Sequence, residues 1–269
     1  MLLQQSQLTQ FAKDGYCAAP HFFTADEVAA MQLELERMRR AGQFNEVARQ
    51  EDSSPRQNLQ LMPIYDKSDL YRALPFAEKV KRAISMLIGE RFILHLDQSF
   101  LKPARHGSGT AWHQDNAYFK IADPWKGVAL WIAIHDATIA NGTMHVIPGH
   151  VSMQHEHSKD PNGQVHIRCY PPEELAVPIE LAAGGALFFA YGTPHCTRGN
   201  TTDRDRAGVA LHFLHEDFAR ADLVEPDRRT RPYVCGPNAT GGLKEYGVVV
   251  DGTWDTEVRR VLYAAAVTA

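Results

Sequence analysis

A histidine and an aspartate lie two residues apart, as His113 and Asp115, in the stretch TAWHQDNAYF. A neutral imidazole and a carboxylate together suit a divalent iron, manganese or zinc ion. The spacing alone is weak evidence, because it recurs at His95–Asp97 and at His215–Asp217 in a chain with 13 histidines and 32 acidic residues. A third ligand and its surroundings must therefore distinguish one pair from the others.

His195, in the stretch YGTPHCTRGN, is the best candidate for the third ligand. It opens a predicted late strand directly after a turn that contains glycine and proline. Side chains two apart on a strand point to the same face, so His113 and Asp115 are expected to share one face of an early strand. In a jelly roll, the late strand would bring His195 to the barrel mouth beside that early strand.

Arg206 begins the run RAGVALHFLH, in which two sets of residues alternate. The set from Ala207 to Phe213 is apolar and predicts a core face, whereas the set with Arg206 is mostly small and predicts a face that lines a cavity. An inward arginine needs an anion, because burying an unpaired charge is costly, and a carboxylate is its natural bidentate partner. The alternative is an ion pair at the surface, at the start of the strand.

Two helices are expected before residue 90. The first covers 23–42, with Thr24 as N-cap and Glu27 three residues later, as in a capping box, and with apolar residues at helical spacing. The second covers 75–89 and carries a similar apolar stripe. These helices should pack against a sheet.

From about residue 91 the chain changes to short runs rich in β-branched and aromatic residues, separated by Gly, Pro and Asn. Such runs are typical of a barrel or a two-sheet jelly roll. The insertion at 150–174 is long enough to be a lid or binding loop. In the tail, coil is expected over 228–242 and a last helix over 253–266.

We expect one domain over 1–269, mainly β with flanking helices: a helical part at 1–90, a jelly-roll core at 91–215 and a C-terminal extension at 216–269. The net charge of −4 gives no electrostatic footprint for nucleic acid. The longest apolar run, GVALWIAI, is too short to span a bilayer, and the N-terminus lacks a signal-peptide pattern. The four cysteines have no CxxC spacing and are expected to be free thiols. A cytoplasmic protein is the default expectation, and its oligomeric state is left open.

Four motifs follow one another along the chain: WHQD at 112–115, NGTMHVIPG at 141–149, PHCTRGN at 194–200 and DRAG at 205–208. Together with the opening FAKDGYCAAPHFFTADEVAAM, they resemble the phytanoyl-CoA dioxygenase family of iron(II)- and 2-oxoglutarate-dependent oxygenases. Each motif is weak by itself, but the resemblance extends over nearly the whole chain to about residue 215. One departure is Pro148-Gly149-His150, where the family usually has PGSH.

The resemblance implies a double-stranded β-helix (a jelly roll of the cupin-like kind) with His113, Asp115 and His195 as a facial triad for Fe(II). It implies that Arg206 binds the distal carboxylate of 2-oxoglutarate. Thr197 looks like a hydroxyl that assists there, and Gln98 has a spacing similar to that of a glutamine that contacts the cosubstrate in related hydroxylases.

The implied reaction uses O2 to hydroxylate an unactivated C–H bond of a small molecule, while 2-oxoglutarate is converted to succinate and carbon dioxide. Asp115 favours hydroxylation, or desaturation or ring closure, over halogenation, since halogenating relatives have a small residue there. Two alternatives are a cupin-like metalloenzyme that does not use 2-oxoglutarate and a non-catalytic binding protein with the same fold. Arg206 argues against the first, and the intact set of four residues argues against the second.

The sequence also offers candidate substrate contacts, each with a plainer structural explanation. A buried core position is the commoner role for Trp131, and Asn116 and Tyr118 equally suit a solvated loop. Strand alternation predicts that His145 faces inward, where a satisfied barrel histidine is commoner than a polar substrate contact. Arg168 in the insertion could hold an anionic group. The candidates are Asn116, Tyr118, Trp131, His145 and Arg168, with His166 and the segment 56–61 as further possibilities.

Overall fold

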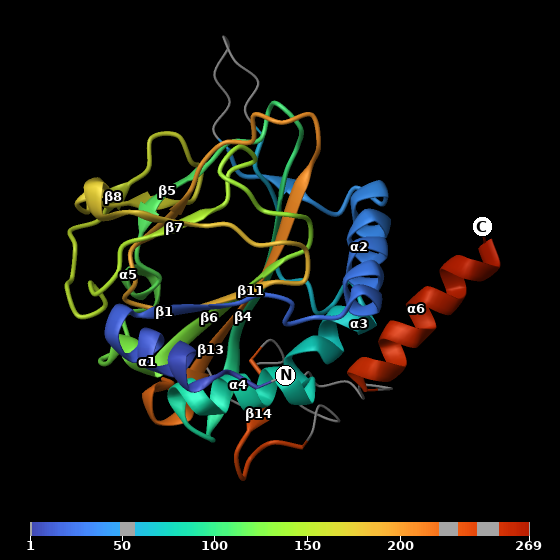
Figure 1. Cartoon of the computed structure of the whole chain (residues 1–269), viewed down its shortest axis with the longest axis horizontal. Coiled ribbons are helices and arrows are strands. Elements are labelled where there is room, and N and C mark those ends of the chain that lie inside the picture. Colours follow the sequence, from blue (N-terminus) through green and yellow to red (C-terminus); the bar gives the residue numbers. More distant parts are fainter. Residues whose placement is uncertain (1, 49–56, 221–230, 241–252, 269) are drawn as a thin grey trace.

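Two antiparallel sheets form the centre of the molecule (Figure 1). The computed structural model describes residues 2–48, 57–220, 231–240 and 253–268. The larger sheet contains, in spatial order, β1 (Tyr16–Ala19), β11 (Ala186–Ala190), β6 (Gly127–Ala133), β13 (Arg206–His215), β4 (Phe92–Lys102), β3 (Leu59–Leu61) and β2 (Asn45–Glu46), and β14 (Tyr233–Cys235) pairs with β4. The smaller sheet contains β10 (Val177–Ile179), β7 (Met144–Val146), β12 (His195–Thr197) and β5 (Thr110–His113). This is the jelly roll that the short alternating runs predict.

Helices cover the outer face of the larger sheet (Figure 1). They are α1 (Gln5–Asp14), α2 (Ala25–Arg40), α3 (Asp69–Ala73) and α4 (Glu78–Ile88), whereas α6 (Trp254–Thr268) packs on α2 and α3, and α5 (Asn116–Phe119) lies beside the candidate site. Thr24 caps α2 as expected: its hydroxyl accepts from the backbone N–H of Glu27, whose carboxylate accepts from the backbone N–H of Thr24. Short 3-10 turns occur at Leu74–Phe76, Pro124–Lys126, Glu173–Leu175 and Glu216–Phe218.

The two faces of β13 differ as the alternation predicts. Ala207, Val209, Leu211 and Phe213 belong to the main hydrophobic core with residues of α2 and α4. Arg206, Ala210 and His212 line a cavity between the sheets. The apolar stripe that the sequence shows therefore fixes which face of the strand is covered by helices and which faces inward.

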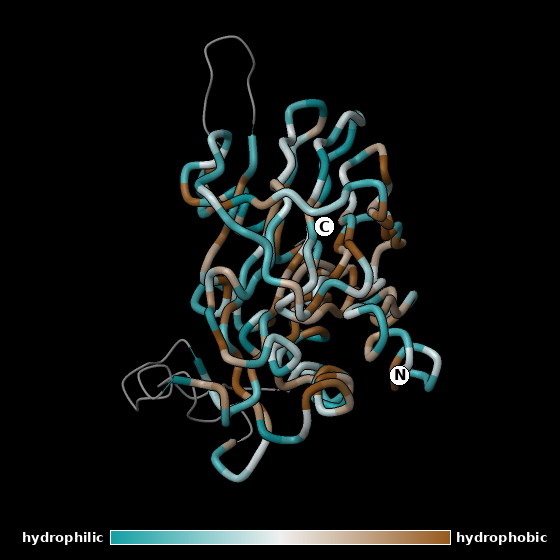
Figure 2. The backbone as a smooth tube through the Cα atoms, turned by 90° about the vertical axis from the view of Figure 1, so that its left-hand side faces the viewer, coloured by the Kyte–Doolittle hydropathy of each residue, from teal (hydrophilic) through white to brown (hydrophobic). Residues whose placement is uncertain are grey.

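Hydrophobic segments run mainly through the centre of the fold, and many of the connecting loops are hydrophilic (Figure 2). The insertion at 150–174 is more ordered than a plain loop, because it contains the two-stranded pair β8 (Ser158–Lys159) and β9 (Ile167–Arg168). In the tail, the expected coil is interrupted by β14, which extends the larger sheet. Residues 228–230 and 241–242 of that expected coil lie outside the described residues. No helix in the described ranges is long and apolar enough to cross a membrane.

Candidate metal centre and its cavity

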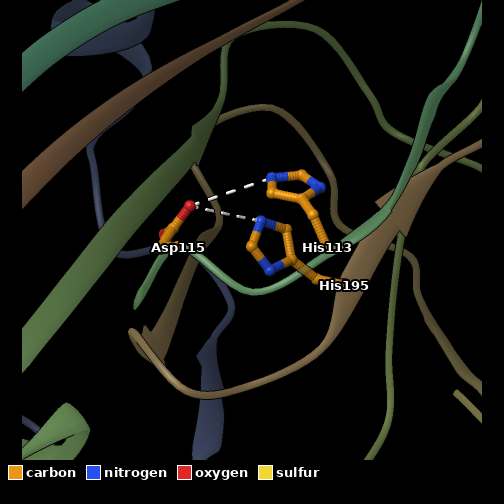
Figure 3. A group of neighbouring side chains, drawn as sticks. All are labelled: His113, Asp115 and His195. Carbon is orange, nitrogen blue, oxygen red and sulfur yellow. Dashed lines mark ion pairs between the residues drawn. The ribbon is translucent and has the colours of Figure 1, made fainter. Parts of the chain in front are cut away.

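His113, Asp115 and His195 lie together between the sheets (Figure 3). Each offers one ligand atom, and these atoms lie within 4.8 Å of one another. His113 ends β5, and His195, at the start of β12, is its cross-strand partner. The structure therefore brings together the three residues that the motifs single out.

Asp115 reaches this position differently from what strand alternation suggests. β5 ends at His113, and Asp115 adopts a helical backbone conformation (φ −57°, ψ −34°) just before α5. The intervening Gln114 holds this turn: its side-chain amide donates to the carbonyls of Met153 and Gly192, and its carbonyl accepts from the backbone N–H of His155. The hydrogen bonds of the buried Gln114 side chain hold this turn. The turn, and not a shared strand face, orients the carboxylate of Asp115.

The two histidines are oriented through their Nδ1 atoms. Nδ1 of His113 lies 2.8 Å from the carbonyl of Ala111, and Nδ1 of His195 lies 3.0 Å from the carbonyl of Thr193. Donation of Nδ1–H to these carbonyls leaves a lone pair on each Nε2. Both Nε2 atoms lie 3.8 Å from Oδ1 of Asp115, too far for a good hydrogen bond but compatible with a shared ion.

The protonation states of the three residues also suit a cation. Burial lowers the pKa of His113 to about 3 and also lowers the pKa of His195, so both imidazoles are neutral near pH 7. Burial by itself would raise the pKa of Asp115, but interactions with His212 and His195 outweigh it and hold the pKa below its usual range. Two neutral imidazoles and one carboxylate are the donor set expected for a facial triad, and the residues fit a divalent ion.

Neither of the other two His-x-Asp pairs forms such a cluster. The carboxylate of Asp97 accepts hydrogen bonds from the backbone N–H groups of Ile64 and Tyr65, at 2.9 and 2.7 Å. Asp217 lies in the short turn after β13, where its N–H donates to Nδ1 of His215. Both aspartates thus have local structural roles.

A cavity of about 320 Å³ adjoins the candidate metal centre. The two histidines and Asp115 lie on its wall together with Arg206 and Lys102. It is lined by residues of β3, β4, β6 and β13 on one side and of β5, β7 and β12 on the other. The cavity is therefore the interior of the jelly roll.

Arg206 is only 1% exposed and has its guanidinium 5.6 Å from the ring centre of Trp131. One terminal nitrogen donates to the carbonyl of Gly142, whereas Nε has no hydrogen-bond partner in the described part of the chain. Burial lowers the pKa of Arg206 to about 10, so the guanidinium still carries its charge at neutral pH. A buried, charged and incompletely bonded guanidinium indicates a missing anionic partner.

Lys102, which the sequence reasoning missed, is the register partner of Arg206 and is likewise 1% exposed. Its ammonium donates to the hydroxyl of Thr197 at 2.7 Å and to the carbonyl of Arg198. Burial and then the charge of Arg206 lower the pKa of Lys102 well below its usual value. The sequence could have predicted that Lys102 faces the cavity, because it lies four residues after Gln98 on the same strand and residues at even spacing share a face.

His212 is a second missed residue. Its Nε2 lies 3.1 Å from Oδ2 of Asp115, on the same cavity-facing side of β13 as Arg206. The alternation within RAGVALHFLH places it on the inward face, but nothing local reveals a partner 97 positions earlier in the chain.

The other predicted contacts divide into two groups. Thr197, Gln98, Trp131 and Tyr118 line the cavity, as do His166 and, from the segment 56–61, Gln60. Asn116 does not, because its amide bonds to the backbone of Ile121 and closes the turn around α5.

His145 and Arg168 also lie elsewhere. On β7 it is Met144 that lines the cavity, so alternation turns His145 to the opposite face, contrary to expectation. Arg168 lines a separate hollow of about 570 Å³ and stacks on Tyr170, with 5.0 Å between the guanidinium carbon and the ring centre. That hollow contains none of the three clustered side chains.

The comparisons of this sequence with known proteins agree with one another. The sequence model of the phytanoyl-CoA dioxygenase (PhyH) family matches residues 11–208. Ectoine dioxygenase from Stutzerimonas stutzeri (strain A1501) is 26% identical over 245 residues, covering 78% of this chain and 76% of that protein. Phytanoyl-CoA dioxygenase from Arabidopsis thaliana is 27% identical over 176 residues, covering 61% and 62%. The 2-aminoethylphosphonate dioxygenase of uncultured bacterium HF130_AEPn_1 is 25% identical over 158 residues, covering 58% and 59%.

Solved structures show the same fold at low sequence identity. The structure of EctD from S. alaskensis with 2-oxoglutarate and 5-hydroxyectoine superposes with a TM-score of 0.64 at 21% identity, covering 80% of this chain and 77% of that chain. The non-heme α-ketoglutarate-dependent epimerase SnoN from nogalamycin biosynthesis gives a TM-score of 0.65 at 20% identity, covering 86% and 85%. At these identities the likeness concerns the fold alone.

Proposed function

The chain belongs to the phytanoyl-CoA dioxygenase family, and on this premise we propose that it is an Fe(II)- and 2-oxoglutarate-dependent dioxygenase. In this proposal, His113, Asp115 and His195 hold the iron, and the reaction hydroxylates an unactivated C–H bond of a small molecule. Two neutral imidazoles and a carboxylate on one side of an ion leave its other positions free for small ligands.

The observation that carries the proposal is the pair of buried cations, Arg206 and Lys102, in the same cavity as the candidate metal ligands. Within the described residues neither cation has a carboxylate partner. Thr197, which accepts from Lys102, is two residues along β12 from His195, a rise of about 7 Å. A five-carbon dicarboxylate can span that length, with one end at the metal and the other at the cations.

The side chains of the cavity would then have the following roles. Arg206 and Lys102 bind the distal carboxylate of 2-oxoglutarate, with Thr197 fixing the ammonium and Trp131 packing on the guanidinium. The walls of the cavity exclude water and hold the substrate C–H near the metal. Gln98, which lines the same cavity, remains a predicted cosubstrate contact.

When bound, Fe(II) would supply the redox chemistry by which O2, 2-oxoglutarate and a C–H bond become an alcohol, succinate and carbon dioxide. One oxygen atom of O2 enters the alcohol and the other enters succinate, so atoms and electrons balance without a further reductant. The protein contributes orientation and a water-poor site rather than acid–base chemistry.

The buried cations also separate this function from the alternatives. A cupin-like metalloenzyme that does not use 2-oxoglutarate has no need for two unpaired cations in the barrel, which are costly to bury. A non-catalytic binding protein has no need for a metal ligand set beside them.

The test is anaerobic addition of Fe(II) and 2-oxoglutarate to the purified protein. Bidentate chelation of iron by the 2-oxo acid should produce a weak visible charge-transfer band, and substrates can then be found by screening for stimulated succinate formation. Folded protein that shows no such band would rule out the proposed cosubstrate.

A further inference from the structure

The proposed metal and cosubstrate sites leave most of one side of the cavity unused. Arg206 belongs to β13 and Trp131 to β6, whereas β4 and then β3 lie on the other flank of β13. With the cosubstrate over β13 and β6 and reaching Lys102 at the end of β4, the rest of the flank formed by β4 and β3 is left for the substrate, with Gln98 at the boundary between the two. This assignment rests on the proposed function.

The floor of this flank is made mainly of uncharged side chains on alternate positions of β4. Leu96, Gln98 and Phe100 all line the cavity and are half-buried. Gln60 of β3 donates from its side-chain amide to the side-chain carbonyl of Gln98 at 2.7 Å. The amide pair therefore retains the N–H donors of Gln98 and an acceptor on Gln60, next to two apolar surfaces.

The roof consists of α5 and the segment before β9. Tyr118 lies edge-on to His113, with ring centres 5.9 Å apart, and its hydroxyl accepts from the backbone N–H of Ile167. The ring of His166 lies 6.2 Å from that of Phe100, so this segment reaches across to the floor. The roof thus closes over the flank from the side of the candidate metal centre.

Formal charge is scarce in this cavity. Among the described lining residues, only Asp115, Lys102 and Arg206 carry a full charge, and all three are assigned to the metal or the cosubstrate. Burial lowers the pKa of His166, so its imidazole is neutral near pH 7, and a tyrosine hydroxyl such as that of Tyr118 is uncharged at this pH. A charged substrate group would meet no counter-charge among the described residues of this flank, and burying an unpaired charge is unfavourable.

The entrance and the size of the cavity also favour a small, largely apolar ligand group. Met62 and Val165, both lining residues, are 49% and 64% exposed, so the rim is apolar. The volume of about 320 Å³ is near the lower limit for ligand pockets. Because the cosubstrate takes part of that volume, only a small group can be enclosed beside it.

We propose that the substrate is a small uncharged molecule, or the uncharged apolar end of a larger one. Its ring or chain would lie on Leu96 and Phe100, and one carbonyl, hydroxyl or amide group would bond to Gln60, Gln98 or His166. Ectoine and 2-aminoethylphosphonate, the compounds named for two relatives, both carry full charges and do not fit this flank.

The test uses three compounds with the same ring: cyclohexanecarboxamide, cyclohexanecarboxylate and cyclohexylmethylammonium. Each is titrated calorimetrically into anaerobic protein loaded with Fe(II) and 2-oxoglutarate, after the charge-transfer band has confirmed loading. The neutral amide should bind about tenfold or more tightly than either charged compound. Equal binding, tighter binding of a charged compound, or no binding of the amide at millimolar concentration would overturn the inference. Because loading is verified first, such a result would leave the proposed function intact, whereas absence of the band would concern that function instead.

A charge placed on this flank should reverse the preference. Gln60→Glu adds a carboxylate beside Gln98 and should make cyclohexylmethylammonium the tightest of the three. Gln57→Glu is the matched control, because it adds the same charge three residues earlier at an exposed position that does not line the cavity. If both variants melt like the unmodified protein and Gln60→Glu leaves the order of affinities unchanged, the assignment of this flank to the substrate is wrong.

Discussion

Nε2 of His212 lies 3.1 Å from Oδ2 of Asp115, while Oδ1 of the same carboxylate faces the two candidate histidine ligands. Because the pKa of Asp115 is lowered, the carboxylate is ionised and the imidazole must be the hydrogen-bond donor. His212 therefore fixes which oxygen of Asp115 is presented to a metal. Groups that hold a metal ligand in this way commonly affect metal affinity although they never touch the ion.

Replacing His212 with alanine should weaken Fe(II) binding by about 10- to 100-fold, because Asp115 loses its donor and can rotate away. The measurement is a metal titration of the protein without cosubstrate, so that it reports binding and not turnover. His212→Gln retains an amide donor and should restore part of the affinity.

His145→Ala serves as the control for that experiment. His145 lies on the face of β7 opposite the cavity, and its Nδ1 is 3.2 Å from the carbonyl of Thr143. Its replacement should leave Fe(II) affinity unchanged. An equal loss in the two alanine variants would mean that general destabilisation, and not the bond to Asp115, explains the effect.

The separate roles of Arg206 and His113 predict a difference between two binding measurements. Arg206→Ala should weaken 2-oxoglutarate binding by at least about 30-fold, corresponding to ~2 kcal/mol, because a buried charge pair is lost. Fe(II) binding should change little. His113→Ala should impair both, since the cosubstrate binds through the metal. Equal effects of the two variants on both ligands would contradict this division of roles.

The sequence predicted the elements better than it predicted the contacts between them. The strand β13 and the helix α2 were predictable because alternation and capping are local properties of RAGVALHFLH and of the stretch after Thr24. The clustering of the three candidate ligands was also predictable, because the order and spacing of several motifs identify the segments that carry them. The roles of these residues, like the extent of the single domain, stay predictions.

The failures concern register and long-range packing. His145 was expected to face inward, but pairing of β7 with β10 and β12 turns Met144 inward instead. A shift of one residue exchanges the two faces of a strand, and distant partners determine that register. Lys102 and His212 were missed for the same reason: their partners, Thr197 and Asp115, are 95 and 97 residues away.

Glu27 should stabilise the contact between the helical layer and the C-terminal helix. Its carboxylate accepts from Lys79 and from the indole N–H of Trp254, each at 2.6 Å, besides capping α2. Burial opposes ionisation, but these bonds outweigh it and lower the pKa of Glu27. Glu27→Gln should reduce the free energy of unfolding near pH 7 by about 1–3 kcal/mol.

The pH dependence gives the control for Glu27. A carboxyl whose pKa is lower in the folded than in the unfolded protein adds stability above its unfolded pKa of about 4.3, and this stability disappears as the pH falls through the folded value. The difference between the two proteins in urea unfolding should therefore stay nearly constant from pH 7 to about pH 5 and shrink as the pH falls below about 4. A difference that persists unchanged down to about pH 3 would show that the charge of Glu27 is not responsible.

Lys102 should make 2-oxoglutarate binding depend on pH. In the protein without cosubstrate, burial and then the charge of Arg206 lower the pKa of Lys102, which favours loss of its proton. A carboxylate placed beside the amine favours the ammonium form and raises that pKa again. Binding should therefore take up as much as about one proton, and affinity should fall as the pH rises.

Calorimetry in two buffers with different ionisation enthalpies measures the uptake. Lys102→Arg keeps a permanent charge and should bind 2-oxoglutarate without uptake, whereas Lys102→Met should lose both uptake and affinity. Equal proton uptake in all three proteins would assign the proton to another group.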